Sequence, residues 1–141
     1  MNINKYIGIP FKQKGYDFEG VDCFGLVHLF LKEEMGMEIP MFKQYDVFED
    51  PIEVARQFNL NVPLIAGDVT TSPKFGDMAL FKFRGVANHI GIYVGNGRVL
   101  HAMRGTESAC ESINSVRLKG RLENYYELRE ENKIKYSTTP V

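Results

Sequence analysis

The stretch Val21-Asp22-Cys23-Phe24-Gly25-Leu26-Val27 decides the fold of this chain, because it places a thiol where a helix is expected to begin. Asp22 is a residue type that favours helix N-caps, and apolar residues recur after it at helical spacing. Gly36 is typical of the position just past a helix end. Peptide dipoles and free N–H groups at a helix start favour a thiolate, so we expect Cys23 to be an ionised, accessible nucleophile.

The rest of the chain changes from helical to strand-like patterns. A short helical turn is expected near residues 3–7, and Pro51 begins a second, shorter helix that runs to Phe58. Strands are expected over residues 78–83, 89–94, 98–103, 116–118 and 125–129. Helices followed by strands predict an α+β fold in which the helix that begins at Cys23 packs on an antiparallel sheet. We expect one domain over residues 1–141, with a core over about 5–130 and a loose C-terminal tail.

Composition limits the classes of function. The 141 residues carry a formal net charge of −1, which does not indicate binding to nucleic acid or to an anionic membrane. The sequence contains neither an apolar run long enough to span a membrane nor the apolar core of a signal peptide. We therefore expect a protein that is cytoplasmic until lysis, or that is built into a particle. Two cysteines make no disulfide framework, so both thiols are expected to be free.

A hairpin around residues 95–97 determines whether two histidines meet. A two-residue loop would pair residue 95 with 98 and put His89 and His101 on opposite faces of the sheet. A three-residue loop would pair residue 94 with 98, place Gly91 opposite His101 and put both imidazoles on one face. We predict the three-residue loop, in which Gly91 leaves room beside the ring of His101.

Cys23, His89 and His101 together are typical of thiol catalysis. His89 is the expected general base and acid, and His101 is expected to hold its ring in one tautomer and orientation. His28 lies about 140° around the helix from Cys23 and is expected to be partly exposed and uninvolved. Cys110 has acidic neighbours that oppose a thiolate, so it is expected to be inert. Zinc sites usually show close ligand pairs such as Cys-x-x-Cys, which this sequence lacks, so we expect no metal and no cofactor.

These motifs, in this order, resemble the NlpC family of papain-like cell-wall peptidases. The matching residues are Asp22 to Val27, Gly76-Asp77, His89 to Gly97 and Leu100 to Ala102, and the resemblance covers about residues 5–130. It implies a papain-like fold and cleavage of peptidoglycan stem peptides, typically between γ-linked D-glutamate and a diamino acid. It places Cys23, His89 and His101 on the three catalytic positions. Residues 6–11 and 125–129 look like the branch found in phage tail proteins and phage cell-wall hydrolases.

The resemblance also suggests substrate-binding residues. Asp22 falls where the family often has a carboxylate that holds the substrate's free amine. Phe11 stands where many members have a tyrosine linked to substrate and oxyanion contacts, and Phe24 stands where many have a serine. Both phenylalanines remove a hydroxyl, so the scissile bond could differ from the usual one. Tyr16 could supply a hydroxyl from another direction.

The sequence therefore predicts a single-domain cysteine peptidase of peptidoglycan peptides, associated with phage. One alternative is a structural component of a phage tail tip, bound to other tail proteins, in which hydrolysis is weak or dispensable. Another alternative retains the thiol but changes the reaction to that of a transpeptidase, deamidase or thioesterase. No nucleic acid or membrane partner is expected under any of these readings.

Overall fold

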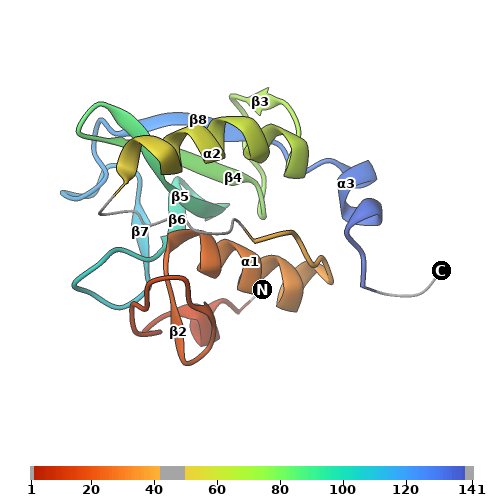
Figure 1. The fold of residues 1–141 in the computed structure, drawn as a ribbon, viewed down its shortest axis with the longest axis horizontal. Helices are drawn as coiled ribbons and strands as arrows, with labels where there is room; N and C mark the ends of the chain where they lie inside the picture. The colour runs from red at the N-terminus through yellow and green to blue at the C-terminus, as the bar shows by residue number, and fades with distance from the viewer. Residues whose placement is uncertain (1, 42–49, 139–141) are drawn as a thin grey trace.

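A computed structural model describes residues 2–41 and 50–138 (Figure 1). Its helices are η1 (Asn4–Tyr6, a 3-10 helix), α1 (Cys23–Met35), α2 (Pro51–Ile65) and α3 (Glu130–Lys135). Its strands are β1 (Tyr16–Asp17), β2 (Gly20–Val21), β3 (Val69–Thr70), β4 (Met78–Phe83), β5 (Val86–Gly95), β6 (Arg98–His101), β7 (Ala109–Ser112) and β8 (Leu122–Tyr126). None of the helices in these ranges combines the length and the apolar character needed to cross a membrane.

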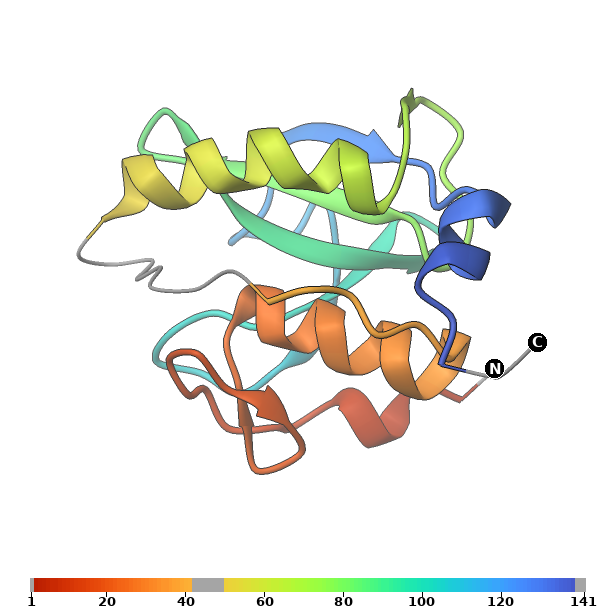
Figure 2. The same ribbon diagram turned by 45° about the vertical axis from the view of Figure 1, so that its right-hand side comes forward.

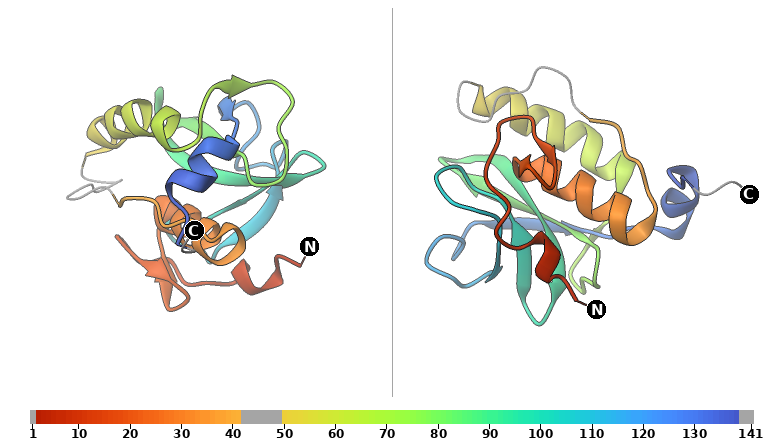
Figure 3. Two further views of the ribbon diagram at one scale, coloured as in Figure 1. Left: turned by 90° about the vertical axis from the view of Figure 1, so that its right-hand side faces the viewer. Right: turned by 90° about the horizontal axis from the view of Figure 1, so that it is seen from below.

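One antiparallel sheet of six strands, in the order β3-β8-β4-β5-β6-β7, carries the fold. Helices α1 and α2 lie on the same side of this sheet (Figure 3), and their buried side chains form one core with residues of β4, β5 and β6. A smaller cluster that includes Phe81 and Leu118 covers the other face. The short hairpin of β1 and β2 packs along α1 on the side away from α2 (Figure 2). This arrangement is the α+β fold that the sequence predicts.

Helix α1 begins and ends at the expected residues. The Asp22 carboxylate accepts a hydrogen bond from the Gly25 N–H, and Gly36 adopts a left-handed conformation with φ +63°. A Cβ on Gly25 would lie 1.7 Å from the carbonyl oxygen of Gly15, so only glycine lets the preceding loop pack on the first turn. Cys23, in the same turn, is 2% exposed and belongs to the buried core. The expectation that Cys23 is accessible is therefore wrong.

Several expected elements differ in extent or position, and among them the strands expected over residues 89–94, 98–103 and 125–129 are β5, β6 and β8, with other bounds. Helix α2 continues past Phe58 to Ile65, and Pro63 in its last turn removes a single N–H donor without ending it. Residues 116–118 form turns, and the strand expected there is found instead at 109–112, where β7 pairs with β6. The expected loose tail is ordered as far as it is described, because α3 follows β8 and Ser137 pairs with Met37.

The hairpin between β5 and β6 combines the two alternatives weighed from the sequence. Gly95 pairs with Arg98 across a two-residue Asn96-Gly97 turn, so the predicted three-residue loop is wrong. Both turn residues have positive φ, as a hairpin turn matching the strand twist requires. A register shift between Tyr93 and Gly95 then restores the predicted strand pairing, with Ile92 opposite Leu100. Continuing this register places Gly91 opposite His101, as predicted.

Candidate active site

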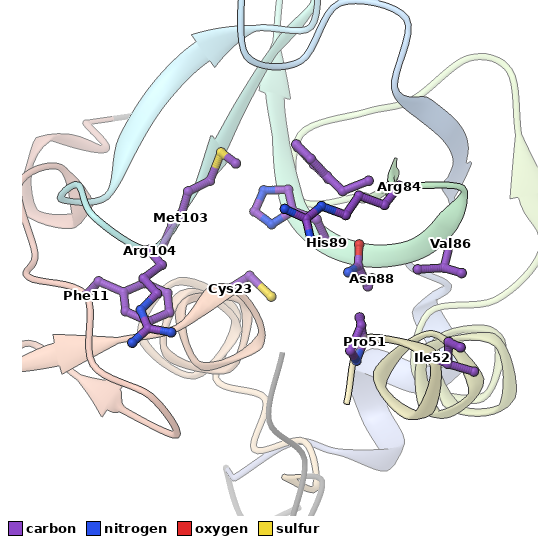
Figure 4. A pocket seen from close by; sticks show the side chains of 12 residues that line it. Phe11, Cys23, Pro51, Ile52, Arg84, Val86, Asn88, His89, Met103 and Arg104 are labelled. Atoms are coloured by element: carbon purple, nitrogen blue, oxygen red, sulfur yellow. The ribbon is translucent and has the colours of Figure 1, made fainter. Parts of the chain in front are cut away.

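A pocket of about 410 Å³ opens between the start of α1, the start of α2 and the start of β5 (Figure 4). Cys23 enters it from the first turn of α1, and His89 enters it from β5. The other lining residues are Phe11, Pro51, Ile52, Phe83, Arg84, Val86, Asn88, Ala102, Met103 and Arg104. Most of these are apolar, so the pocket offers a desolvated surface with a few polar groups beside a thiol and an imidazole.

The two predicted histidines are in direct contact. Nε2 of His89 lies 2.9 Å from Nδ1 of His101, and both side chains are buried. A Cβ on Gly91 would lie 3.1 Å from the Cβ of His101 and 2.8 Å from the Leu100 carbonyl oxygen. The absence of a side chain at Gly91 therefore lets β5 and β6 approach closely enough for the rings to meet.

The structure adds an acidic residue behind His101 that the sequence analysis missed. Nε2 of His101 forms a short hydrogen bond with Oε2 of Glu111, on β7. Arg117, in the turns after β7, donates from Nη2 and Nε to the same oxygen at 2.6 and 3.1 Å. Four side chains thus form a continuous line from the pocket to the surface. Glu111 was interpreted only as a neighbour of Cys110, because strand β7 was not predicted.

The electrostatics of Cys23 differ from the expectation of a ready-made thiolate. Burial raises the pKa of the thiol to about 12, and the nearby charge of Asp22 adds to that increase. The backbone of Ile90, on β5, lowers the pKa, and so do the backbone groups of Phe24 and Cys23 at the start of α1. The last two are the helix-start effect that the sequence predicts, but together these groups do not outweigh burial. The free protein therefore holds Cys23 as a neutral thiol at neutral pH.

The histidines are neutral as well. Burial lowers the pKa of His89 well below its ordinary value, and the charges of His101 and Arg117 lower it further. Burial also lowers the pKa of His101, although its hydrogen bond with Glu111 and the charge of that carboxylate act in the opposite direction. The resting site is thus a thiol beside an imidazole, from which an ion pair can form as the reaction begins.

Of the four expected substrate residues, the structure places one in the pocket. Phe11 is part of the lining, whereas Phe24 is fully buried and packs against Phe58, with ring centroids 6.0 Å apart. The buried Asp22 carboxylate accepts hydrogen bonds from the N–H groups of Gly25 and Lys14, so it caps the helix instead of facing a substrate.

Tyr16 lies outside the pocket lining as well. Its ring stacks edge-on against His28, with centroids 5.6 Å apart. His28 is buried, which corrects the expectation that it is partly exposed, and its Nδ1 has no hydrogen-bond partner among the residues that the structure describes.

The second cysteine does not line this pocket. Cys110 lies on β7 and is partly exposed, and both cysteines are free, as predicted. Within residues 2–41 and 50–138, no group of three or more histidine, cysteine or acidic side chains could hold a metal ion. Cys23 and His89, which line one pocket, can perform nucleophilic attack by sulfur with proton transfer through imidazole.

Comparison with known proteins gives this arrangement a context. The Escherichia coli (strain K12) protein named "Murein DD-endopeptidase MepS/Murein LD-carboxypeptidase" is 29% identical over 114 residues, which are 81% of this chain and 53% of that protein. The "Probable endopeptidase NlpC homolog" of Haemophilus influenzae is 24% identical over 111 residues, or 79% of this chain and 51% of that protein. The chain thus spans about half the length of these relatives.

Solved structures share the fold. The NlpC/p60 domain of the peptidoglycan hydrolase SagA matches with a TM-score of 0.60 and 21% identity, over 88% of this chain and 91% of that domain. An NlpC/P60 family protein of Bacillus cereus matches with a TM-score of 0.63 and 20% identity, over 87% of this chain and 36% of that protein. The sequence profile of the NlpC/P60 family itself matches residues 8–126. This chain, with its helix bearing Cys23 packed on a six-stranded antiparallel sheet, therefore belongs to the NlpC/P60 family and has its papain-like α+β fold.

Proposed function

We propose that this protein is a cysteine peptidase that hydrolyses amide bonds in the peptide part of peptidoglycan. The observation that carries the proposal is the placing of Cys23 and His89 on one pocket, with His89 hydrogen-bonded to His101 behind it. Membership of the NlpC/P60 family and the similarity to a protein named as a murein endopeptidase support peptidoglycan as the substrate.

The reaction follows from which ring nitrogens are occupied. Nε2 of His89 is held by His101, so Nδ1 is the nitrogen left to act on the thiol. As Sγ of Cys23 bonds to the carbonyl carbon, the thiol proton moves to Nδ1 and negative charge develops on the carbonyl oxygen. The C–N bond then breaks, and His89 returns the proton to the leaving amine. Water attacks the resulting thioester, giving its proton to His89, and Sγ leaves with that proton as the carboxylic acid is released.

Substrate binding uses the residues that line the pocket. The backbone N–H of Cys23 can donate to the developing oxyanion, while Phe11 has no hydroxyl with which to do so. Arg84 and Arg104 both line the pocket, and a guanidinium pairs well with a carboxylate. Stem peptides with free carboxylates therefore suit this site better than peptides recognised by a free amine.

The test is digestion of purified peptidoglycan, with the products identified by mass spectrometry. The wild type is expected to release peptides that Cys23→Ala does not release, because the variant lacks the nucleophile. Cys110→Ala is the matched control, since it removes the other free thiol away from the pocket, and it should give the wild-type products. Identical products from wild type and Cys23→Ala would exclude Cys23 from the reaction. Products that show amide-to-acid conversion or ester cleavage, and no peptide cleavage, would identify the enzyme as a deamidase or thioesterase and not a peptidase.

The phage setting remains a separate prediction. None of the relatives described above is named as a phage protein, so residues 6–11 and 125–129 are its sole support. A tail component is expected to copurify with other tail proteins and to clear cell walls poorly as an isolated chain. Efficient clearance by the isolated chain would argue against a mainly structural role.

A further inference from the structure

We propose that Glu111, held in place by Arg117, is a positioning residue that fixes the tautomer of His101 and, through it, the tautomer of His89. The proposal rests on the proposed function for the reaction it serves, but the arrangement of protons that it describes exists without substrate. It assigns a role to two residues that lie behind the predicted catalytic histidines and outside the pocket lining.

The first step concerns Glu111. An ionised carboxylate can only accept hydrogen bonds, so a nitrogen that is hydrogen-bonded to it must carry a proton. Burial alone would raise the pKa of Glu111, but hydrogen bonds from Arg117 and His101 together with their charges hold it below its ordinary value. Glu111 is therefore ionised at neutral pH, and Nε2 of His101, which contacts Oε2, must carry a proton.

The second step passes this choice to His89. A neutral imidazole has one protonated and one bare nitrogen, so a proton on Nε2 of His101 leaves its Nδ1 as an acceptor. Nε2 of His89, at 2.9 Å from that nitrogen, must then be the donor. This leaves Nδ1 of His89 bare, which is the form that can accept the proton of the Cys23 thiol.

The third step is what happens without the carboxylate. His101 could then carry its proton on Nδ1 and donate it to Nε2 of His89. That arrangement would put the proton of His89 on Nδ1, where the thiol has to deliver its own. A carboxylate at position 111 excludes this inactive tautomer, and it also stabilises the positive charge that His89 acquires during the reaction.

Arg117 makes Glu111 suitable for this role. Its guanidinium contacts both carboxylate oxygens, with Nε 3.3 Å from Oε1 and Nη2 2.6 Å from Oε2. These contacts keep the carboxylate ionised and aimed at His101, whose side chain is fully buried. Arg117 is thus the outermost residue in a chain of hydrogen bonds that links His89 to His101, His101 to Glu111, and Glu111 to Arg117.

The tautomers can be measured directly by nitrogen-15 NMR of the imidazoles in the free wild-type protein at neutral pH. We expect protonated Nε2 and bare Nδ1 on both His89 and His101. A protonated Nδ1 on His101 would overturn the proposal, whatever the protein does to peptidoglycan. Because this measurement needs no substrate, it separates failure of this inference from failure of the proposed function.

Kinetics of variants provide the second measurement. Glu111→Ala is expected to lower kcat by about tenfold to a hundredfold with little change in KM, because a fraction of His89 adopts the wrong tautomer while the pocket is unaltered. Glu111→Gln, which keeps an acceptor oxygen but no charge, should recover part of this loss. Glu123 lies on β8 and pairs with Lys82 on β4. Glu123→Ala removes this carboxylate, and as the matched control it should keep wild-type kcat.

Two kinetic results would count against the role of Glu111. One is an equal kcat for Glu111→Ala and Glu123→Ala, and the other is a Glu111→Gln variant as slow as Glu111→Ala, which would mean that the acceptor oxygen does not matter. Should Glu111→Ala fail to fold, the wild-type NMR measurement still decides the proposal.

Discussion

At Cys23, burial and helix position act on the same sulfur in opposite directions. Backbone groups at the start of α1 lower the pKa of the thiol, as its sequence position predicts, but burial raises it more and brings it to about 12. Burial also lowers the pKa of His89, so we expect no compensating imidazolium in the free protein. In the proposed reaction the thiolate would then form when the substrate is attacked and would not be present beforehand.

Alkylation of Cys23 by iodoacetamide tests this balance, with Cys110→Ser as the background. Thiolates react and thiols do not, so the rate should stay low near neutral pH and keep rising through the alkaline range. A rate that is already constant between about pH 5 and 7 would indicate a preformed thiolate–imidazolium pair and contradict this prediction.

Asp22 illustrates how one residue can have a different role from the one its position in a motif suggests. Its carboxylate caps α1 and is not on the pocket, and its charge raises the pKa of Cys23. Asp22→Asn keeps a capping oxygen and should lower the alkylation pKa of Cys23 with little loss of stability. Asp22→Ala should lower the free energy of unfolding by about 1–2 kcal/mol, because the cap is lost. Urea denaturation of both variants checks the second expectation, and equal stability of the two would show that the cap is unimportant.

Among the elements, those with local signals were predictable and those that depend on partners were not. The cap at Asp22 and the glycine at 36 predict α1 from sequence alone, and the almost continuous apolar run Met78–Phe83 predicts β4. Strand β7 contains Ala-Cys-Glu-Ser, which has no β-branched or aromatic residue, and it is a strand because β6 pairs with it. Missing β7 also meant missing Glu111, so the error in the element became an error in the site.

The hairpin shows the same division between local and distant causes. Positive φ at Asn96 and Gly97 gives a two-residue turn, but the bulge that follows restores the face on which His89 and His101 meet. The sequence predicts the correct face for both histidines but the wrong loop length, because a bulge can compensate for one residue of turn length.

Close packing of β5 against β6 at Gly91 should be required for the contact between the rings of His89 and His101. Gly91→Ala would place a Cβ 2.8 Å from the Leu100 carbonyl oxygen and 3.1 Å from the Cβ of His101, so one strand must move. We expect a loss of about 1–3 kcal/mol in the free energy of unfolding, together with a lower kcat because the rings separate. Denaturant titration and the peptidoglycan assay measure the two effects.

Gly120→Ala is the matched control for this substitution. Gly120 has φ +74° with nothing within 4 Å of an added Cβ, so it reports backbone strain without a clash at the site. Its kcat should remain at the wild-type level. A Gly91→Ala variant with unchanged kcat would show that the spacing of the two strands does not control the imidazole pair.

Across the whole molecule, the three histidines are all buried, and burial lowers the pKa of each. An unperturbed histidine has a pKa of about 6.5. Below that pH the histidines of the unfolded chain bind protons, whereas the buried histidines of the folded chain stay neutral until the pH is lower. The free energy of unfolding should therefore decrease as the pH falls below about 6.5, by up to about 1.4 kcal/mol per pH unit for each such proton.

Urea midpoints at pH 7.5 and pH 5 measure this dependence. His28 is the position to vary, since it is buried without a role in the proposed reaction and its Nδ1 has no partner within residues 2–41 and 50–138. His28→Leu should make the dependence on pH shallower, because one protonation of the unfolded chain is removed. Equal stability at the two pH values in the wild type would mean that the native histidines titrate as freely as the unfolded ones.

A sulfur that keeps its proton is also a poor target for hydrogen peroxide, since oxidation to sulfenic acid begins at the thiolate. Burial of this sulfur in the first turn of α1 therefore does more than shape a pocket. It should keep Cys23 reduced in the presence of oxidants until attack on a bound peptide transfers the proton to His89, so that the vulnerable thiolate exists only while there is something to cleave.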